Sequence, residues 1–280
     1  MLGVRSITGV RLQPAVSLLA RTSLKSAVAT RSYAKNPDIT KMPLNVFGCL
    51  ADYYVPPRFL DCPITSWPRL VVRRLTAFAF NTIGVVRYKK DTNLKLHFDD
   101  WKERTIENYV KTNKVFAKAC SARKDLRHKY IHEQLADVAG KHVVDALCSR
   151  ALSFPSGAKL TWKLVKVVEN PKVVSFNPLP NHDDITVFIQ LVTKVKTKQQ
   201  MTVETSEGEV QTTERLVTDY LVSTIDPFSE EQLLVGSIFE SDHIRKVQPE
   251  FNPEDLEQAT AFQNRAADLY REPPKALKSA

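Results

Sequence analysis

Residues 67–90 read WPRLVVRRLTAFAFNTIGVVRYKK, which is the most apolar run of the chain and has arginines set into it. At 100° per residue this run predicts a basic amphipathic helix. The longest uncharged stretch, residues 75–86, has 12 residues, whereas a helix needs about 20 to cross a bilayer. The helix can therefore lie against a membrane or a protein core, but we do not expect it to span. Its broad apolar face would comprise Val71, Val72, Leu75, Phe78, Ala79, Ile83, Val85 and Val86.

The opposite face of this helix carries Arg69, Arg73 and Arg87. We expect the apolar face to cover the sheet, as part of the core, and the arginine stripe to be the functional side. Phe80 is the one large apolar residue on that stripe, so membrane contact, if the helix makes it, is expected through Phe80. Arginine forks suit the phosphate oxygens of RNA and of anionic lipid. The candidate phosphate-contacting residues are Arg58, Arg69, Arg73, Arg74, Arg87, Lys89 and Lys90.

Upstream of the helix, residues 1–33 contain five basic residues, several Ser and Thr, and no acid. This composition is typical of a mitochondrial transit peptide, and we expect cleavage between Tyr33 and Ala34. Residues 34–68 hold six prolines, which no continuous helix or central strand tolerates, so they predict an extended arm. Thr65 or Ser66 would then cap the helix.

Downstream, helical spacing predicts a second helix over about 99–122 and a third over about 130–152. The apolar period then changes to two, which indicates strands around 160–164, 185–191, 216–225 and 233–239. Turns are expected at Asn170-Pro171, Pro178 to Asp184 and Ser206 to Glu209. A last short helix is expected within 253–270.

Helices followed by strands predict an α+β fold, with the N-terminal helices packed on one face of a curved antiparallel sheet of about four strands. The domain plan is a transit peptide (1–33), an extended arm (34–68), an α+β domain (69–240) and a C-terminal tail with a short helix (241–280). The net charge of +9 is concentrated in residues 1–130, while residues 131–280 are acidic. The positive charge of residues 1–130 would attract phosphate-rich surfaces. The alternative is that these basic residues only form a well-solvated protein surface.

Signatures of catalysis and of cofactor binding are missing from the sequence. No nucleotide-binding, nucleophile-elbow or zinc-protease motif occurs, and the four cysteines have no metal-binding spacing. His128 and His132 would share one helical face, but a solvated surface is the favoured interpretation. Asp219 and Tyr220 are adjacent in one predicted strand, so they should face opposite sides of the sheet, with Asp219 toward solvent or a lysine. We expect no enzyme activity, no cofactor and no metal.

Several longer segments carry a resemblance to a known family. They are FDDWKERTIENYVKTNKVFAK (98–118), LTWKLVKV (160–167), GSIFES (236–241), LYREPP (269–274) and the basic apolar helix over 69–88. At these segments the chain resembles the fungal mitochondrial inner-membrane ribosome receptors. More distantly it is similar to the cone-shaped C-terminal domain of the forty-four-kilodalton inner-membrane translocase subunit, and to a membrane-anchoring large-subunit mitoribosomal protein.

The resemblance implies a peripheral protein on the matrix side of the inner membrane that holds the mitoribosome near its exit tunnel. Its implied partners are ribosomal RNA and proteins of the large subunit, anionic lipid, the general insertase and nascent mitochondrially encoded respiratory-chain proteins. The alternatives are a permanent large-subunit ribosomal protein, a scaffold subunit of the import motor and a small pocket enzyme on the same fold.

Overall fold

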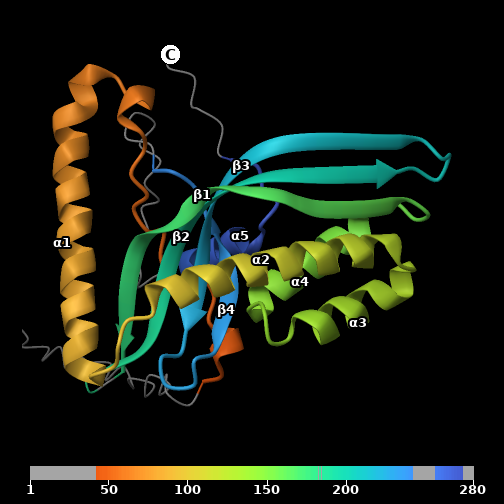
Figure 1. The fold of residues 1–280 in the computed structure, drawn as a ribbon. Coiled ribbons are helices and arrows are strands. Elements are labelled where there is room, and N and C mark those ends of the chain that lie inside the picture. The colour runs from red at the N-terminus through yellow and green to blue at the C-terminus, as the bar shows by residue number, and fades with distance from the viewer. Residues whose placement is uncertain (1–41, 182, 184, 242–255, 274–280) are drawn as a thin grey trace, which may run out of the picture. The chain divides into compact units, whose positions relative to one another are not determined.

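The computed structural model describes residues 42–181, 183, 185–241 and 256–273, and it confirms the α+β class (Figure 1). The predicted transit peptide and its cleavage point between Tyr33 and Ala34 lie outside the described residues. In the described part of the chain, the helices are α1 (Trp67–Thr92), α2 (Phe98–Ser121), α3 (Lys124–Leu135), α4 (Lys141–Ser153) and α5 (Leu256–Ala267). The strands are β1 (Lys159–Pro180), β2 (Thr186–Glu204), β3 (Val210–Ile225) and β4 (Gln232–Ile238).

The sheet is an antiparallel meander in the order β1-β2-β3-β4. Two predicted turns are confirmed, because Asn181 N–H donates to Ile185 O at 2.8 Å and Thr205 N–H donates to Glu209 O at 2.9 Å. The turn predicted at Asn170-Pro171 is wrong, since β1 continues through it with register shifts on both sides of Glu169. An edge strand tolerates proline there, because one side of an edge strand has no ladder to complete.

Helices α2 and α4 cover one face of the sheet, α3 packs on both of them, and together they make the largest core cluster. Leu221 of β3 points into this cluster, whereas its neighbours Tyr220 and Val222 point to the other face. That second face is covered by the arm and by α5, through Cys49, Val55, Phe262 and Ala266. Around β4 and the adjoining parts of β2 and β3, the sheet is therefore buried on both sides by elements that lie far apart in the sequence.

The helix predicted over 130–152 is two helices, α3 and α4, separated by residues 136–140. In this break the backbone pairs with β4, as Leu234 N–H donates to Val138 O and Gly140 N–H donates to Leu234 O, both at 2.9 Å. The apolar residues on either side keep helical spacing across the break, which is why periodicity alone concealed it.

Arg127 of α3 is 1% exposed and ties the ends of two other helices together. Its guanidinium donates to five backbone carbonyls, those of Cys120, Ala122, Ala151, Phe154 and Pro155, at 2.6–3.4 Å. These carbonyls belong to the C-terminal turns of α2 and α4 and the residues after them, where helix carbonyls lack intrahelical partners and the helix dipole favours a cation. A buried cation is thereby satisfied without a carboxylate.

The described part of the arm, residues 42–66, packs in part against the chain's own sheet. Gln190 of β2 organises this contact, since its amide donates to Gly48 O at 2.8 Å and accepts from Leu50 N–H and from the Tyr53 hydroxyl. Further along, Val55 exchanges two hydrogen bonds with Ser241. The arm therefore completes the core before it reaches α1.

The short C-terminal helix is confirmed as α5, and residues 253–255 of the expected helix lie outside the described residues. A Cβ on Gly236 of β4 would lie 2.6 Å from Ala266 O, so α5 can approach β4 only because this position is glycine. Beyond α5, Asp268 pairs with Arg150 of α4 at 2.5 Å, and the Tyr270 hydroxyl donates to Asn113 of α2 at 2.6 Å. These contacts bring the C-terminal segment onto the helical layer.

Candidate functional site

Helix α1 runs along β1, the edge strand of the sheet (Figure 1). Its inner side is narrow, and the buried residues there are Leu70, Gly84 and Tyr88. Tyr88 packs edge-on against Trp101 and Phe176, with ring centroids 6.5 and 5.9 Å apart. A Cβ on Gly84 would lie 3.0 Å from Phe176 O, so the close approach of helix and strand depends on this glycine.

Asn81 supplies the main polar link between α1 and the sheet edge. Its side-chain amide donates to Val174 O at 2.9 Å and accepts from Phe176 N–H at 3.0 Å. These two bonds replace those that a neighbouring strand would make with β1. The helix thus covers part of an edge that would otherwise pair with other strands.

At the C-terminal end of α1, Asp91 accepts hydrogen bonds from the Thr186 hydroxyl at 2.7 Å and the Thr186 N–H at 3.2 Å. These bonds, with a smaller contribution from Arg87, hold the pKa of Asp91 below its usual range. Arg87 Nε lies 3.5 Å from the Asp91 carboxylate. Arg87 is therefore partly engaged within the protein.

The outward side of α1 is apolar and exposed, contrary to our prediction that the apolar face covers the sheet. The exposed fractions of its larger side chains range up to 70% for Phe78. We define the outer apolar face as Val71, Val72, Leu75, Phe78, Ala79, Ile83 and Val86, all of which are exposed. The sheet edge instead receives the narrow opposite side of the helix, where Gly84 permits close approach to Phe176 and Asn81 bonds to β1.

Cationic side chains border the outer apolar face. Arg69 and Arg73 lie along one margin and are exposed, and Lys89 and Lys90 are exposed at the C-terminal end. Arg58 is exposed just before the helix. An apolar strip bordered by cations is the pattern of a helix that lies in the plane of an anionic membrane surface.

Arg74 differs from the other predicted phosphate-contacting residues. It is half-buried, donates to Pro57 O at 2.6 Å, and its guanidinium carbon lies 4.2 Å above the Phe59 ring. These contacts clamp the arm to α1, which is a structural role.

Phe80 lies on the arginine side of α1, as expected, and is 68% exposed. Its position thus extends the apolar surface of the helix past its arginine margin. The sequence before α1 extends the surface as well, because Leu60 and Ile64 are exposed in the two 3₁₀ turns that precede the helix, Phe59–Asp61 and Ile64–Ser66. Trp67 is fixed by its indole N–H, which donates to Phe59 O and Cys62 O.

None of the helices in the described ranges combines the length and apolarity that a membrane span requires.

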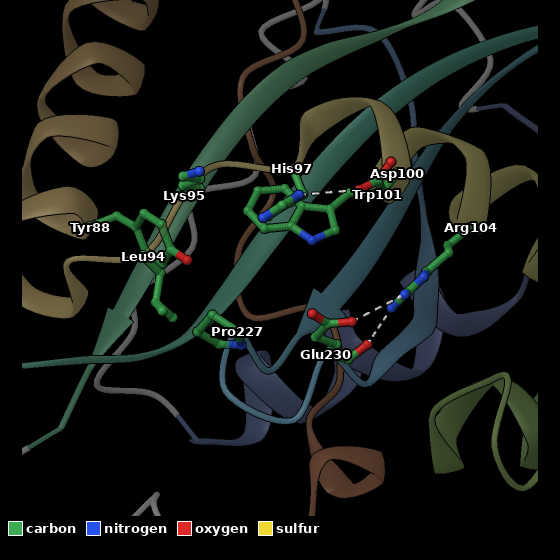
Figure 2. A pocket seen from close by; sticks show the side chains of 9 residues that line it. All are labelled: Tyr88, Leu94, Lys95, His97, Asp100, Trp101, Arg104, Pro227 and Glu230. Carbon is green, nitrogen blue, oxygen red and sulfur yellow. Dashed lines mark hydrogen bonds and ion pairs between the residues drawn. The ribbon is translucent and has the colours of Figure 1, made fainter.

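A separate hollow of about 190 Å³ lies between the α1–α2 connection and the β3–β4 turn (Figure 2). Arg104 of α2 crosses it and donates to Glu230 O at 2.6 Å, and His97 lies 3.2 Å from Asp100. Figure 2 shows both pairs beside Trp101. The first pair ties α2 to the β3–β4 turn, and the second lies within the start of α2, so both are contacts internal to the domain.

A second polar group lies inside the domain, between α2 and the sheet. The Tyr109 hydroxyl donates to Asp219 at 2.7 Å and accepts from Gln199 at 3.0 Å. Our expectation that Asp219 faces solvent or a lysine is therefore wrong. Burial raises the pKa of Asp219, against the Tyr109 hydrogen bond that lowers it. Tyr220 points to the opposite face, as predicted, and its hydroxyl donates to Glu240.

Comparison with known proteins places these features in a family. The family model of the MBA1-like proteins matches residues 34–275. The chain is also 30% identical over 236 residues to the inner membrane mitoribosome receptor MBA1, mitochondrial, of Saccharomyces cerevisiae. The aligned region covers 81% of this chain and 80% of the yeast protein. The family expected from the sequence segments is thereby confirmed.

Proposed function

The chain belongs to the MBA1-like protein family, and on that premise we propose that it tethers the mitoribosome to the mitochondrial inner membrane. In this role it is a peripheral protein on the matrix side, with no enzyme activity and no cofactor. The similar yeast protein is named an inner membrane mitoribosome receptor. The observation that carries the proposal in this chain is the outer apolar face of α1 with its cationic border.

The membrane side of the tether is argued from what α1 leaves uncovered. The inner side of the helix is fixed to β1 by Asn81, Gly84 and Tyr88, so the outer apolar face cannot turn inward. Exposed apolar residues grouped on one helix indicate an interaction surface. Basic residues near an anionic membrane contribute about 1 kcal/mol each. The face and its border together would give reversible attachment, which suits a peripheral protein.

The ribosome side of the proposal includes contacts with large-subunit RNA and proteins near the tunnel exit. Holding the exit close to the membrane would pass nascent respiratory-chain proteins directly to the general insertase. This support for co-translational insertion is the finer part of the proposal, and it rests on family resemblance.

A charge-removal experiment tests the membrane side. The full chain with Arg69, Lys89 and Lys90 changed to Gln is floated with vesicles that contain cardiolipin, and is also sedimented with mitoribosomes. At about 1 kcal/mol per cation, vesicle affinity should fall about 150-fold, while ribosome binding persists. The matched control changes Lys111, Lys114 and Lys118, three exposed lysines of α2, and should float normally.

Unchanged flotation of the α1 variant would exclude an electrostatic role for this border. Loss of ribosome binding with normal flotation would show instead that the cations contact the ribosome, and that α1 is not the membrane side of the tether.

A further inference from the structure

Helices α3 and α4 bring together three side chains of the kinds that bind transition metals. His128 and His132 lie one turn apart on α3, with ring centroids 4.3 Å apart. Cys148 of α4 faces them, and one ligand atom from each of the three residues lies within 4.8 Å of the others. The sequence showed only the histidine pair, because the cysteine is placed by the fold.

One ring nitrogen of the cluster has no hydrogen-bond partner in the described part of the chain. His132 Nε2 is buried and has no hydrogen-bond partner among the described residues. Asp145, one turn before Cys148 on α4, has its carboxylate oxygen 3.8 Å from that nitrogen, too far for a hydrogen bond. A buried polar atom without a partner destabilises the fold, and a ligand placed between these groups would remove that cost.

We propose that His128, His132 and Cys148 form a binding site for Zn²⁺, with Asp145 as the fourth ligand. Imidazole, thiolate and carboxylate are the donors that zinc accepts, and a four-coordinate zinc site is tetrahedral. Metal–ligand bonds of about 2.0–2.3 Å put neighbouring ligand atoms about 3.3–3.8 Å apart. The Asp145–His132 separation of 3.8 Å already has this value, and the ligand atoms of His128, His132 and Cys148, which lie within 4.8 Å of one another, would close to this spacing when the metal binds.

Such a site would be structural, because four protein ligands leave no open position for substrate. It would fasten α3 to α4 on the solvent side of the helical layer. Arg127, Ile131 and Leu135 are the buried residues of α3, and the metal would add a link between α3 and α4 on the side where His128 is exposed. Metal that binds only the folded chain raises stability by mass action.

The test uses the full chain, without added affinity histidines, stripped of metal by a chelator. We expect one equivalent of Zn²⁺ to bind and to raise the melting temperature. We also expect Co²⁺ in its place to give the intense visible bands of tetrahedral coordination and a thiolate charge-transfer band. Cys148→Ala should abolish the charge-transfer band, and His128→Gln should weaken Zn²⁺ binding at least tenfold. The matched control is His97→Gln, which lies outside the cluster and should bind normally.

His128 is exposed, so His128→Gln keeps the test valid even if Cys148→Ala fails to fold. Failure to bind one equivalent would overturn the site. Binding that His128→Gln leaves unchanged would overturn it too, because the metal would then lie elsewhere on the chain.

Discussion

Replacing two residues of the outer apolar face should release the protein from vesicles without unfolding it. The change is Leu75→Ser with Ile83→Ser, at side chains that are 63% and 62% exposed. Full burial of such a side chain contributes about 1.5–3 kcal/mol. About three-fifths of each remains available to a partner, which gives about 1–2 kcal/mol per residue and about 2–4 kcal/mol for the pair. Vesicle affinity should therefore fall between about thirtyfold and about a thousandfold.

The assay is flotation of the full chain with cardiolipin-containing vesicles, with urea unfolding measured in parallel. About two-fifths of each side chain is already buried in the domain, so the unfolding free energy should fall by about 1–2 kcal/mol for the pair, with a few tenths more from helix propensity, which leaves the protein folded. The matched control is Val210→Ser with Leu216→Ser on β3, at side chains 65% and 60% exposed. These two substitutions remove a similar apolar area from a surface away from α1. They should therefore leave flotation unchanged.

Two results would refute the reasoning. Normal flotation of the Leu75/Ile83 variant would show that the outer apolar face does not enter lipid. Equal loss in the β3 control would show that exposed apolar area anywhere on the domain determines vesicle binding, and α1 would then have no special role.

Three further predictions concern single residues. Phe80→Ser should weaken vesicle binding by about tenfold with an unchanged melting temperature, because Phe80 is exposed; a large loss of thermal stability would show that it packs inside. Arg127→Lys should lower the unfolding free energy in urea by about 2–5 kcal/mol, since lysine has three donors for five carbonyls; a loss below about 1 kcal/mol would contradict the capping role. The lowered pKa of Asp91 means that its stabilising contribution is complete above about pH 4 and is lost as pH falls through its folded-state pKa. The difference in unfolding free energy between the native chain and Asp91→Asn should therefore shrink as the solution is acidified below pH 4, and a constant difference would refute it.

Much of the fold was predictable because local signals and the final structure agree. The period change after Pro155 located the sheet, and Pro68 in the first turn of α1 marked that helix's start. The break between α3 and α4 was missed because it is stabilised by pairing with β4, a contact that no local pattern contains. The hydrogen bonds of Arg127 were missed too, because the ends of α2 and α4 that accept them are brought together only by the tertiary structure.

The orientation of α1 was predicted wrongly for a physical reason. Hydrophobic content favours the wide apolar face as the buried one, but the edge of β1 requires a close, partly polar contact. Gly84 was the available signal, since glycine within a long helix costs stability unless close packing requires it. Leu70 and Tyr88, the other buried residues of α1, lie on the same side of the helix as this glycine. The candidate cations were found by charge, but the role of Arg74 could only be recognised from its contacts with Pro57 and Phe59.

The most direct test of the tether is an electron-microscopy map of the membrane-bound mitoribosome that contains this protein. The account predicts that α1 lies parallel to the bilayer with Leu75, Ile83 and Val86 toward the lipid, while other surfaces of the domain contact the large subunit near the tunnel exit. A map in which the outer apolar face of α1 packs against ribosomal RNA or protein, away from the membrane, would contradict it.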